Sequence, residues 1–203
     1  MSMNKNMLAL VVGGMIFCLT TWAQSPNAPK RFRGVIESAS AEKIILKERG
    51  GETIEFKLGE KVPISEVFPE SIQKLQPNSF VGSAAVVGAD GRLTALEVLI
   101  FPEIARGTGE GHFPWDLQKD STMTNATVQE LKVSPNGKEM QLKYKDGEKT
   151  IAIPDNIPIV SLRPADSSLL VAGANALIVA IKDKEQWVIN RITVGRNGFK
   201  PPM

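Results

Sequence analysis

A duplication constrains the fold of this chain more than any other feature of its sequence. The two copies are separated by 95 residues and match without a gap at five positions. The matched residues are Val62-Pro63-Ile64, Pro69 and Leu75 in the first copy and Ile157-Pro158-Ile159, Pro164 and Leu170 in the second. Agreement in spacing and proline placement predicts that the copies form the same structural unit.

Each copy contains five short runs in which apolar residues alternate with polar ones, as is typical of strands. A longer connection between the third and fourth runs, 65–78 in the first copy, has room for a helical turn. Asn78 and Gly173 hold equivalent positions before the fourth run, and both tolerate left-handed backbone geometry. The runs are 32–36, 44–46, 54–58, 80–87 and 93–101, then 126–133, 140–144, 150–153, 176–181 and 187–194.

Five short strands with an insert between the third and fourth predict a small, partly closed barrel of the OB kind. The expected fold is all-β, with two tandem five-stranded OB-like barrels joined by an irregular connector rich in glycine, proline and aromatic residues. One continuous β-sandwich made of both copies is the alternative. The predicted segments are a flexible N-terminal segment 24–30, barrels 31–101 and 124–198, the connector 102–123 and a C-terminal tail 199–203.

The first 23 residues are predicted to be a secretory signal peptide. Lys5 provides a positive charge, an apolar run follows from Leu8 to Leu19, and Thr21-Trp22-Ala23 forms a small-x-small cleavage site. The alternative is an uncleaved membrane anchor, because the apolar run approaches the roughly 20 residues that span a bilayer. Cys18 lies within this segment, so the mature chain has no cysteine for disulfides or thiolate metal ligands.

The charge pattern argues against nucleic-acid binding. Removal of residues 1–23 removes one lysine and leaves 23 basic against 22 acidic residues, which are interspersed along the chain. Nucleic-acid binding needs clustered lysine and arginine. We therefore interpret the basic residues near the first three strands of each copy as solvated charges that discourage strand pairing.

The connector holds the chemistry that the repeat does not explain. It contains the only histidine, His112, and one of the two tryptophans of the mature chain, Trp115. One interpretation makes Phe113 and Trp115 an aromatic anchor, with Glu110, His112 and Asp116 as polar groups for a ligand or partner. The other is that the aromatics fill a cleft between the barrels and bury area without a ligand.

Glu110, His112 and Asp116 are also the candidate metal ligands, with Glu103 and Met123 as further donors. Imidazole and carboxylate suit Zn, Cu or Ni, but a closed site usually takes several nitrogen or sulfur ligands. No cofactor is predicted. Catalytic residues are not predicted either, because the mature chain has no cysteine and no nucleophile motif lies near its histidine.

Several motifs resemble a family of uncharacterised secreted proteobacterial proteins with tandem small β-barrel domains of unknown function. The residues that carry the resemblance are Gly107-Thr-Gly-Glu-Gly-His112-Phe-Pro-Trp115-Asp, Met123-Thr-Asn-Ala-Thr127, Ile157-Pro-Ile159, Pro164-Ala-Asp166 and Val194-Gly-Arg-Asn-Gly198-Phe-Lys-Pro-Pro-Met203. Some members carry the label metal transporter permease, which conflicts with a chain that lacks multiple membrane spans. The resemblance implies a soluble periplasmic protein and no reaction.

These observations together predict an exported periplasmic, non-enzymatic binding or interaction protein that uses the connector and the inter-barrel surface. A metal-binding or metal-homeostasis accessory protein and a structural envelope component are the alternatives. The expected partner is an envelope protein or a small ligand, not nucleic acid, with the membrane involved only through an uncleaved signal peptide. We expect a monomer.

Overall fold

The structure, a computed structural model, describes residues 28–134 and 137–202. The predicted signal peptide, and residues 24–27 of the predicted flexible segment, lie outside the described residues. The all-β prediction is confirmed, and each of the ten predicted apolar runs falls within or overlaps a strand. No helix within the described ranges is long and apolar enough to cross a membrane.

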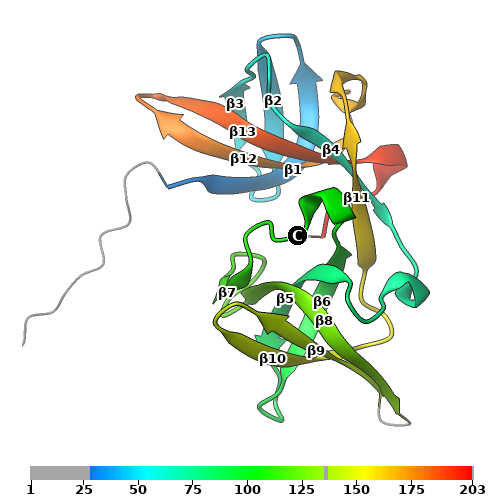
Figure 1. Cartoon of the computed structure of the whole chain (residues 1–203). Helices are drawn as coiled ribbons and strands as arrows, with labels where there is room; N and C mark the ends of the chain where they lie inside the picture. The colour runs from blue at the N-terminus through cyan, green and yellow to red at the C-terminus, as the bar shows by residue number, and fades with distance from the viewer. Residues whose placement is uncertain (1–27, 135–136, 203) are drawn as a thin grey trace, which may run out of the picture.

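Five strands form a first closed barrel (Figure 1). Its pairings run β1–β2–β3–β13–β12 and return to β1, and β3 and β13 are parallel. The strands are β1 (Lys30–Ala39), β2 (Lys43–Glu48), β3 (Thr53–Lys57), β12 (Asn175–Asp183) and β13 (Gln186–Gly195). Closure leaves this small sheet without a free edge.

A second closed barrel has the same pattern of pairings. They run β8–β9–β10–β6–β5 and return to β8, and β10 and β6 are parallel. The strands are β5 (Phe80–Val87), β6 (Leu93–Ile100), β8 (Thr122–Ser134), β9 (Gly137–Tyr144) and β10 (Gly147–Ile153). Both barrels therefore have the order first, second, third, fifth and fourth when the predicted runs of each copy are numbered.

The prediction that 31–101 and 124–198 each close their own barrel is wrong. Each barrel takes its first three strands from one copy and its last hairpin, β12–β13 or β5–β6, from the other. The single β-sandwich alternative is wrong as well, because the pairings form two rings. This is strand exchange within one chain, the intramolecular counterpart of domain swapping.

Two strands that the alternation pattern did not predict carry out the exchange. They are β4 (Ile64–Pro69) and β11 (Ile159–Ala165), which contain the duplicated proline motifs and pass between the barrels (Figure 1). Six residues at roughly 3.3 Å each extend about 20 Å, and a residue before proline favours extended backbone. The predicted helical turn follows β4 as a short 3-10 helix, η1 (Ile72–Lys74).

The register of these crossing strands shows the symmetry of the molecule. β4 and β11 pair antiparallel, with Val67 opposite Leu162, two positions 95 residues apart in the chain. Equivalent positions that meet each other are the mark of a twofold axis. β4 then pairs in parallel with β13, and β11 with β6, in equivalent registers. The two copies are therefore related by a local twofold axis through this pair.

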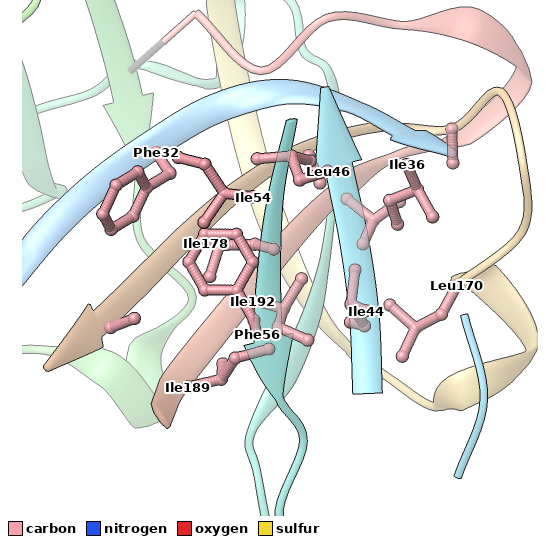
Figure 2. Close-up of a cluster of buried hydrophobic side chains, with 14 residues drawn as sticks. Phe32, Ile36, Ile44, Leu46, Ile54, Phe56, Leu170, Ile178, Ile189 and Ile192 are labelled. Carbon is pink, nitrogen blue, oxygen red and sulfur yellow. The ribbon is translucent and has the colours of Figure 1, made fainter. Parts of the chain in front are cut away.

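The core of each barrel combines side chains from both copies. Figure 2 shows Phe32, Ile44 and Phe56 of the first copy packed with Ile178 and Ile192 of the second. A smaller third cluster lies between the barrels and consists of Val67, Leu99, Val160 and Leu177, with Phe101, Leu162 and Phe199 against it. Burial of these side chains, at about 25 cal/mol per Å² of apolar area, therefore holds the two copies together.

The turns and the ends of the chain follow from local chemistry. Asn78 (φ 70°) and Gly173 (φ 87°) both have left-handed backbone, as their equivalent positions predicted. The predicted C-terminal tail packs on the molecule, since Phe199 contacts the third cluster and the carbonyl of Pro201 accepts a hydrogen bond from Arg49 at 3.1 Å. The remaining 3-10 helices are η2 (Glu103–Ala105), η3 (Ser167–Leu169) and η4 (Arg196–Gly198).

Candidate functional site

The connector is more regular than its glycines and prolines predicted. It contains η2 and a short strand, β7 (Gly111–Pro114), which pairs antiparallel with the first residues of β8. Gly111 has a φ of 141°, a conformation that side chains rarely adopt, as the chain enters β7. Successive side chains of a strand point to opposite faces, so His112 and Phe113 lie on opposite faces of β7.

Glu110 and His112 face the second barrel. The Glu110 carboxylate accepts a hydrogen bond from the backbone N–H of Lys145, in the turn between β9 and β10, at 3.1 Å. His112 Nδ1 lies 2.8 Å from the hydroxyl of Thr124, which is fully buried. Burial, with a smaller effect from the charge of Lys149, lowers the pKa of His112 below its ordinary value. These contacts hold the connector on the second barrel.

Phe113 and Trp115 form the aromatic pair that the sequence predicted, with ring centroids 6.0 Å apart in an edge arrangement. The guanidinium of Arg31, on β1 of the first barrel, lies 3.8 Å from the Trp115 ring centroid. Cation–π contacts of this kind contribute about 0.5–2 kcal/mol. The connector therefore reaches from the second barrel to the first through Trp115.

Asp116 completes this contact. Its carboxylate accepts hydrogen bonds from Arg33 at 2.8 Å and from Arg31 at 3.4 Å. Burial raises the pKa of Asp116, but the hydrogen bonds and charges of Arg33 and Arg31 outweigh it and hold the pKa below its usual range. Arg31 and Arg33 flank the core residue Phe32 on β1, so both point to the outside of the first barrel.

The predicted metal ligands are not assembled. Glu110 contacts the β9–β10 turn, Asp116 contacts arginines of the other barrel, and Glu103 pairs with Arg106 at 2.5 Å. Met123 is buried opposite Phe113. Over the part of the chain that the structure covers, no group of three or more His, Cys, Asp or Glu side chains could hold a metal ion.

The alternation pattern did not predict the arginines that receive the connector. Arg31 and Arg33 belong to a row of four, and the others are Arg49, after β2, and Arg191, on β13. Burial and the charge of Arg33 lower the pKa of Arg49, and burial and the charge of Arg31 lower the pKa of Arg191. The sequence did contain one signal for two of them. In Arg31-Phe32-Arg33 an apolar residue lies between two arginines, and this alternation places both charges on one face of a strand.

A buried glutamate lies near the same row. Glu97 is on β6 of the second barrel, is fully buried, and neither carboxylate oxygen accepts a hydrogen bond from the described residues. Burial raises its pKa to about 8, although the charge of Arg33 acts in the opposite direction. The sequence offered one signal, a single acidic residue within the apolar run 93–101.

Comparison of the chain with protein-family models, with curated proteins and with solved structures finds no match. The function is therefore argued from the geometry of the connector and of the surface that it contacts.

Proposed function

We propose that this chain is an exported, non-enzymatic binding protein whose binding surface is the seam between the barrels. The seam comprises the arginine row Arg31, Arg33, Arg49 and Arg191, together with Trp115 and Asp116 of the connector. The supporting observation is that Trp115 and Asp116 leave the second barrel and contact Arg31 and Arg33 of the first. The non-repeated chemistry of the chain is concentrated at this place.

The exchanged scaffold supports this proposal. A site performs best when rigid elements hold its side chains, and the arginines lie on or next to strands of a closed barrel. The connector is held by the β7–β8 pairing at one end and by hydrogen bonds among Trp115, Gln118 and Ser121 at the other. The Asp116 side chain is 46% exposed, so the seam is accessible to a ligand.

The proposed cellular location is the periplasm, reached through the signal peptide expected at 1–23. It is tested by fractionating the source bacterium and measuring the mass of the recovered protein. A mature chain that begins near Gln24 supports the location. A full-length chain in the membrane fraction contradicts cleavage and favours the anchor alternative.

The proposed surface is tested by complementation of a deletion strain under envelope stress. Trp115→Ala and Arg31→Ala should each lose complementation while the purified variants keep the wild-type fold by circular dichroism, because Arg31 contacts both Trp115 and Asp116. Ile104→Ala is the matched control, because Ile104 is 91% exposed in the same connector and lies outside the seam as defined. Full complementation by both seam variants would overturn the proposal.

A further inference from the structure

The four arginines of the seam lie side by side on the outside of the first barrel. The backbone N–H of Arg49 donates to the carbonyl of Arg33 at 2.9 Å, which places these two next to each other. Arg31 lies opposite Val179 on β12, and Val179 lies opposite Arg191 on β13. The row therefore extends from the end of β2 across β1 and β12 to β13.

Among the described residues, one carboxylate contacts this row of four arginines. Asp116 is the carboxylate that is hydrogen-bonded to Arg31 and Arg33. The Arg49 side chain donates to a backbone carbonyl, and the Arg191 side chain forms no ion pair or hydrogen bond with the residues that the structure describes. The Nε of Arg31 is buried, and no described residue accepts a hydrogen bond from it.

The second arginine cluster of the molecule shows what a balanced arrangement looks like. Arg163 and Arg196 each make two hydrogen bonds, at 2.8–3.1 Å, to the carboxylate of Glu66. Both guanidinium groups there share a buried acid that lies between them. Arg49 and Arg191 share no such acid within the described ranges, although their charges lie close to those of Arg33 and Arg31.

Arginine recognises carboxylate and phosphate through paired N–H groups, and its weak hydration favours such contacts at interfaces. Asp116 shows that the row binds a carboxylate within the molecule, because an N–H group of Arg31 and one of Arg33 donate to it. We propose that the arginine row binds a small soluble ligand with at least two carboxylate or phosphate groups, for which the Asp116 carboxylate is an internal competitor.

In this arrangement one anionic group of the ligand contacts Arg191 and another contacts Arg49, while Trp115 keeps the Arg31 guanidinium flat beside them. Asp116 shares Arg31 and Arg33 with the ligand or is displaced from them. The inference rests on the proposed function for the position of the ligand. Direct binding tests it, whereas complementation tests the proposed function, so that either can fail alone.

The test is isothermal titration calorimetry on the mature chain, with pyrophosphate and citrate as probes at constant ionic strength. Arg191→Ala and Arg49→Ala should each weaken binding about tenfold, which corresponds to about 1.4 kcal/mol. Asp116→Asn should strengthen it several-fold because it removes the competing charge. Arg92→Ala is the matched control and should bind as wild type, because Arg92 is an exposed arginine already paired with Asp90 and Glu139.

The proposal is overturned if neither probe binds at a concentration of about 10 mM, at which even weak ligands are detected. Equal losses in Arg92→Ala and Arg191→Ala would also overturn it, because they would indicate non-specific attraction. A parallel arm uses vesicles of phosphatidylglycerol. Co-sedimentation with vesicles without binding of either soluble probe would assign the row to lipid headgroups and contradict a soluble ligand.

Discussion

Two buried glutamates, one on a crossing strand between the barrels and one on a strand of the second barrel, occupy contrasting surroundings. Glu66 on β4 is 3% exposed and accepts four hydrogen bonds from Arg163 and Arg196, whose side chains are about half exposed. Glu97 on β6 is fully buried and accepts none from the described residues. The hydrogen bonds of Arg196 and Arg163 lower the pKa of Glu66 to about 2, whereas burial raises that of Glu97 to about 8.

The difference shows that hydrogen-bond partners, more than burial, decide how a buried carboxylate affects the stability of the fold. A paired carboxylate keeps its charge and joins the elements that supply its partners, here β4, β11 and η4. An unpaired one lowers stability when it ionises and is retained at a cost. The exchange region therefore has its buried acid paired, whereas Glu97 in the second barrel has no hydrogen-bond donor among the described residues. Each prediction below tests one side of this contrast.

The largest effect is expected for Glu66→Gln. The substitution keeps the shape but leaves two arginines without a buried charge, and we expect a loss of about 2–3 kcal/mol in unfolding free energy. This is less than the ~3–5 kcal/mol for breaking a fully buried pair, because solvent screens both arginines. Urea denaturation at pH 7 measures it. Glu55→Gln, which removes an exposed pair with Lys43, should change stability by about 0.5 kcal/mol or less.

The same pair predicts an acid limit. The Glu66 pKa is lower in the folded chain than its usual value of 4.5, so its contribution to stability is complete above pH 4.5. That contribution is lost as the pH falls towards 2, because the folded carboxylate must then be protonated. A Glu66→Gln variant whose stability differs from wild type by the same amount at pH 3 and pH 7 would contradict this assignment.

Glu97→Gln should raise the unfolding free energy at alkaline pH, which is opposite to the effect of Glu66→Gln. The Glu97 pKa is raised in the folded chain, so wild-type stability falls as the pH rises from about 4.5 to about 8. Over that range the unfolded chain loses the proton while the folded chain keeps it. At pH 9 the variant should be about 1–2 kcal/mol more stable than wild type. This is a fraction of the full linkage value, because the surroundings of Glu97 can relax around the charge. Glu52→Gln is the exposed control, and an unchanged difference between pH 5 and pH 9 would refute the prediction.

Asp116→Asn tests the contact between the connector and the first barrel. Unlike Glu97, the carboxylate changed here is not fully buried. The variant loses the ionic part of its bonds to Arg33 and Arg31, and because Asp116 is about half exposed the expected loss is about 0.5–1 kcal/mol. Thermal denaturation monitored by circular dichroism measures it. A loss as large as that of Glu66→Gln would mean that the two regions are equivalent, contrary to the comparison.

The smallest effect is expected from cutting the connector. A protease site inserted between Gly107 and Gly109, both exposed, allows cleavage of the folded chain. The halves should stay together in gel filtration at neutral pH, because each barrel contains strands of both copies. Independent tandem barrels would separate into two smaller species, and that result would contradict strand exchange.

Local patterns predicted most of the fold. Alternation in runs such as 32–36 and 140–144 reflects strands with one face in a core, and it located ten strands. The alignment placed Asn78 and Gly173 at the same turn, and both have positive φ. The segments β4, β7 and β11 were missed because β4 and β11 contain prolines and lie between barrels, where both faces are partly covered and alternation is weak.

The candidate site was predicted in part. The sequence identified Phe113, Trp115 and Asp116 by their exclusion from the repeat, and the structure brings these three to the seam. It also grouped them with Glu110 and His112, which contact the second barrel instead. The chain leaves β7 after Pro114 and turns towards the first barrel, which places Trp115 and Asp116 there, but β7 itself was not predicted. Arg31 and Arg33, which contact Asp116, belong to the other barrel. Spacing along the chain carries no information about a contact between barrels.

The sequence by itself determined ten of the thirteen described strands, their turns and the existence of two equivalent copies, because these depend on periodicity and on residues a few positions apart. Tertiary structure decided which copy completes each barrel. Either choice buries the same alternating faces, and the extended proline strands β4 and β11 carry each last hairpin to the other barrel. It also decided that Glu66 meets two arginines while Glu97 meets no donor in the part of the chain that the structure describes, since charges at such distances along the chain come together only after the strands have exchanged.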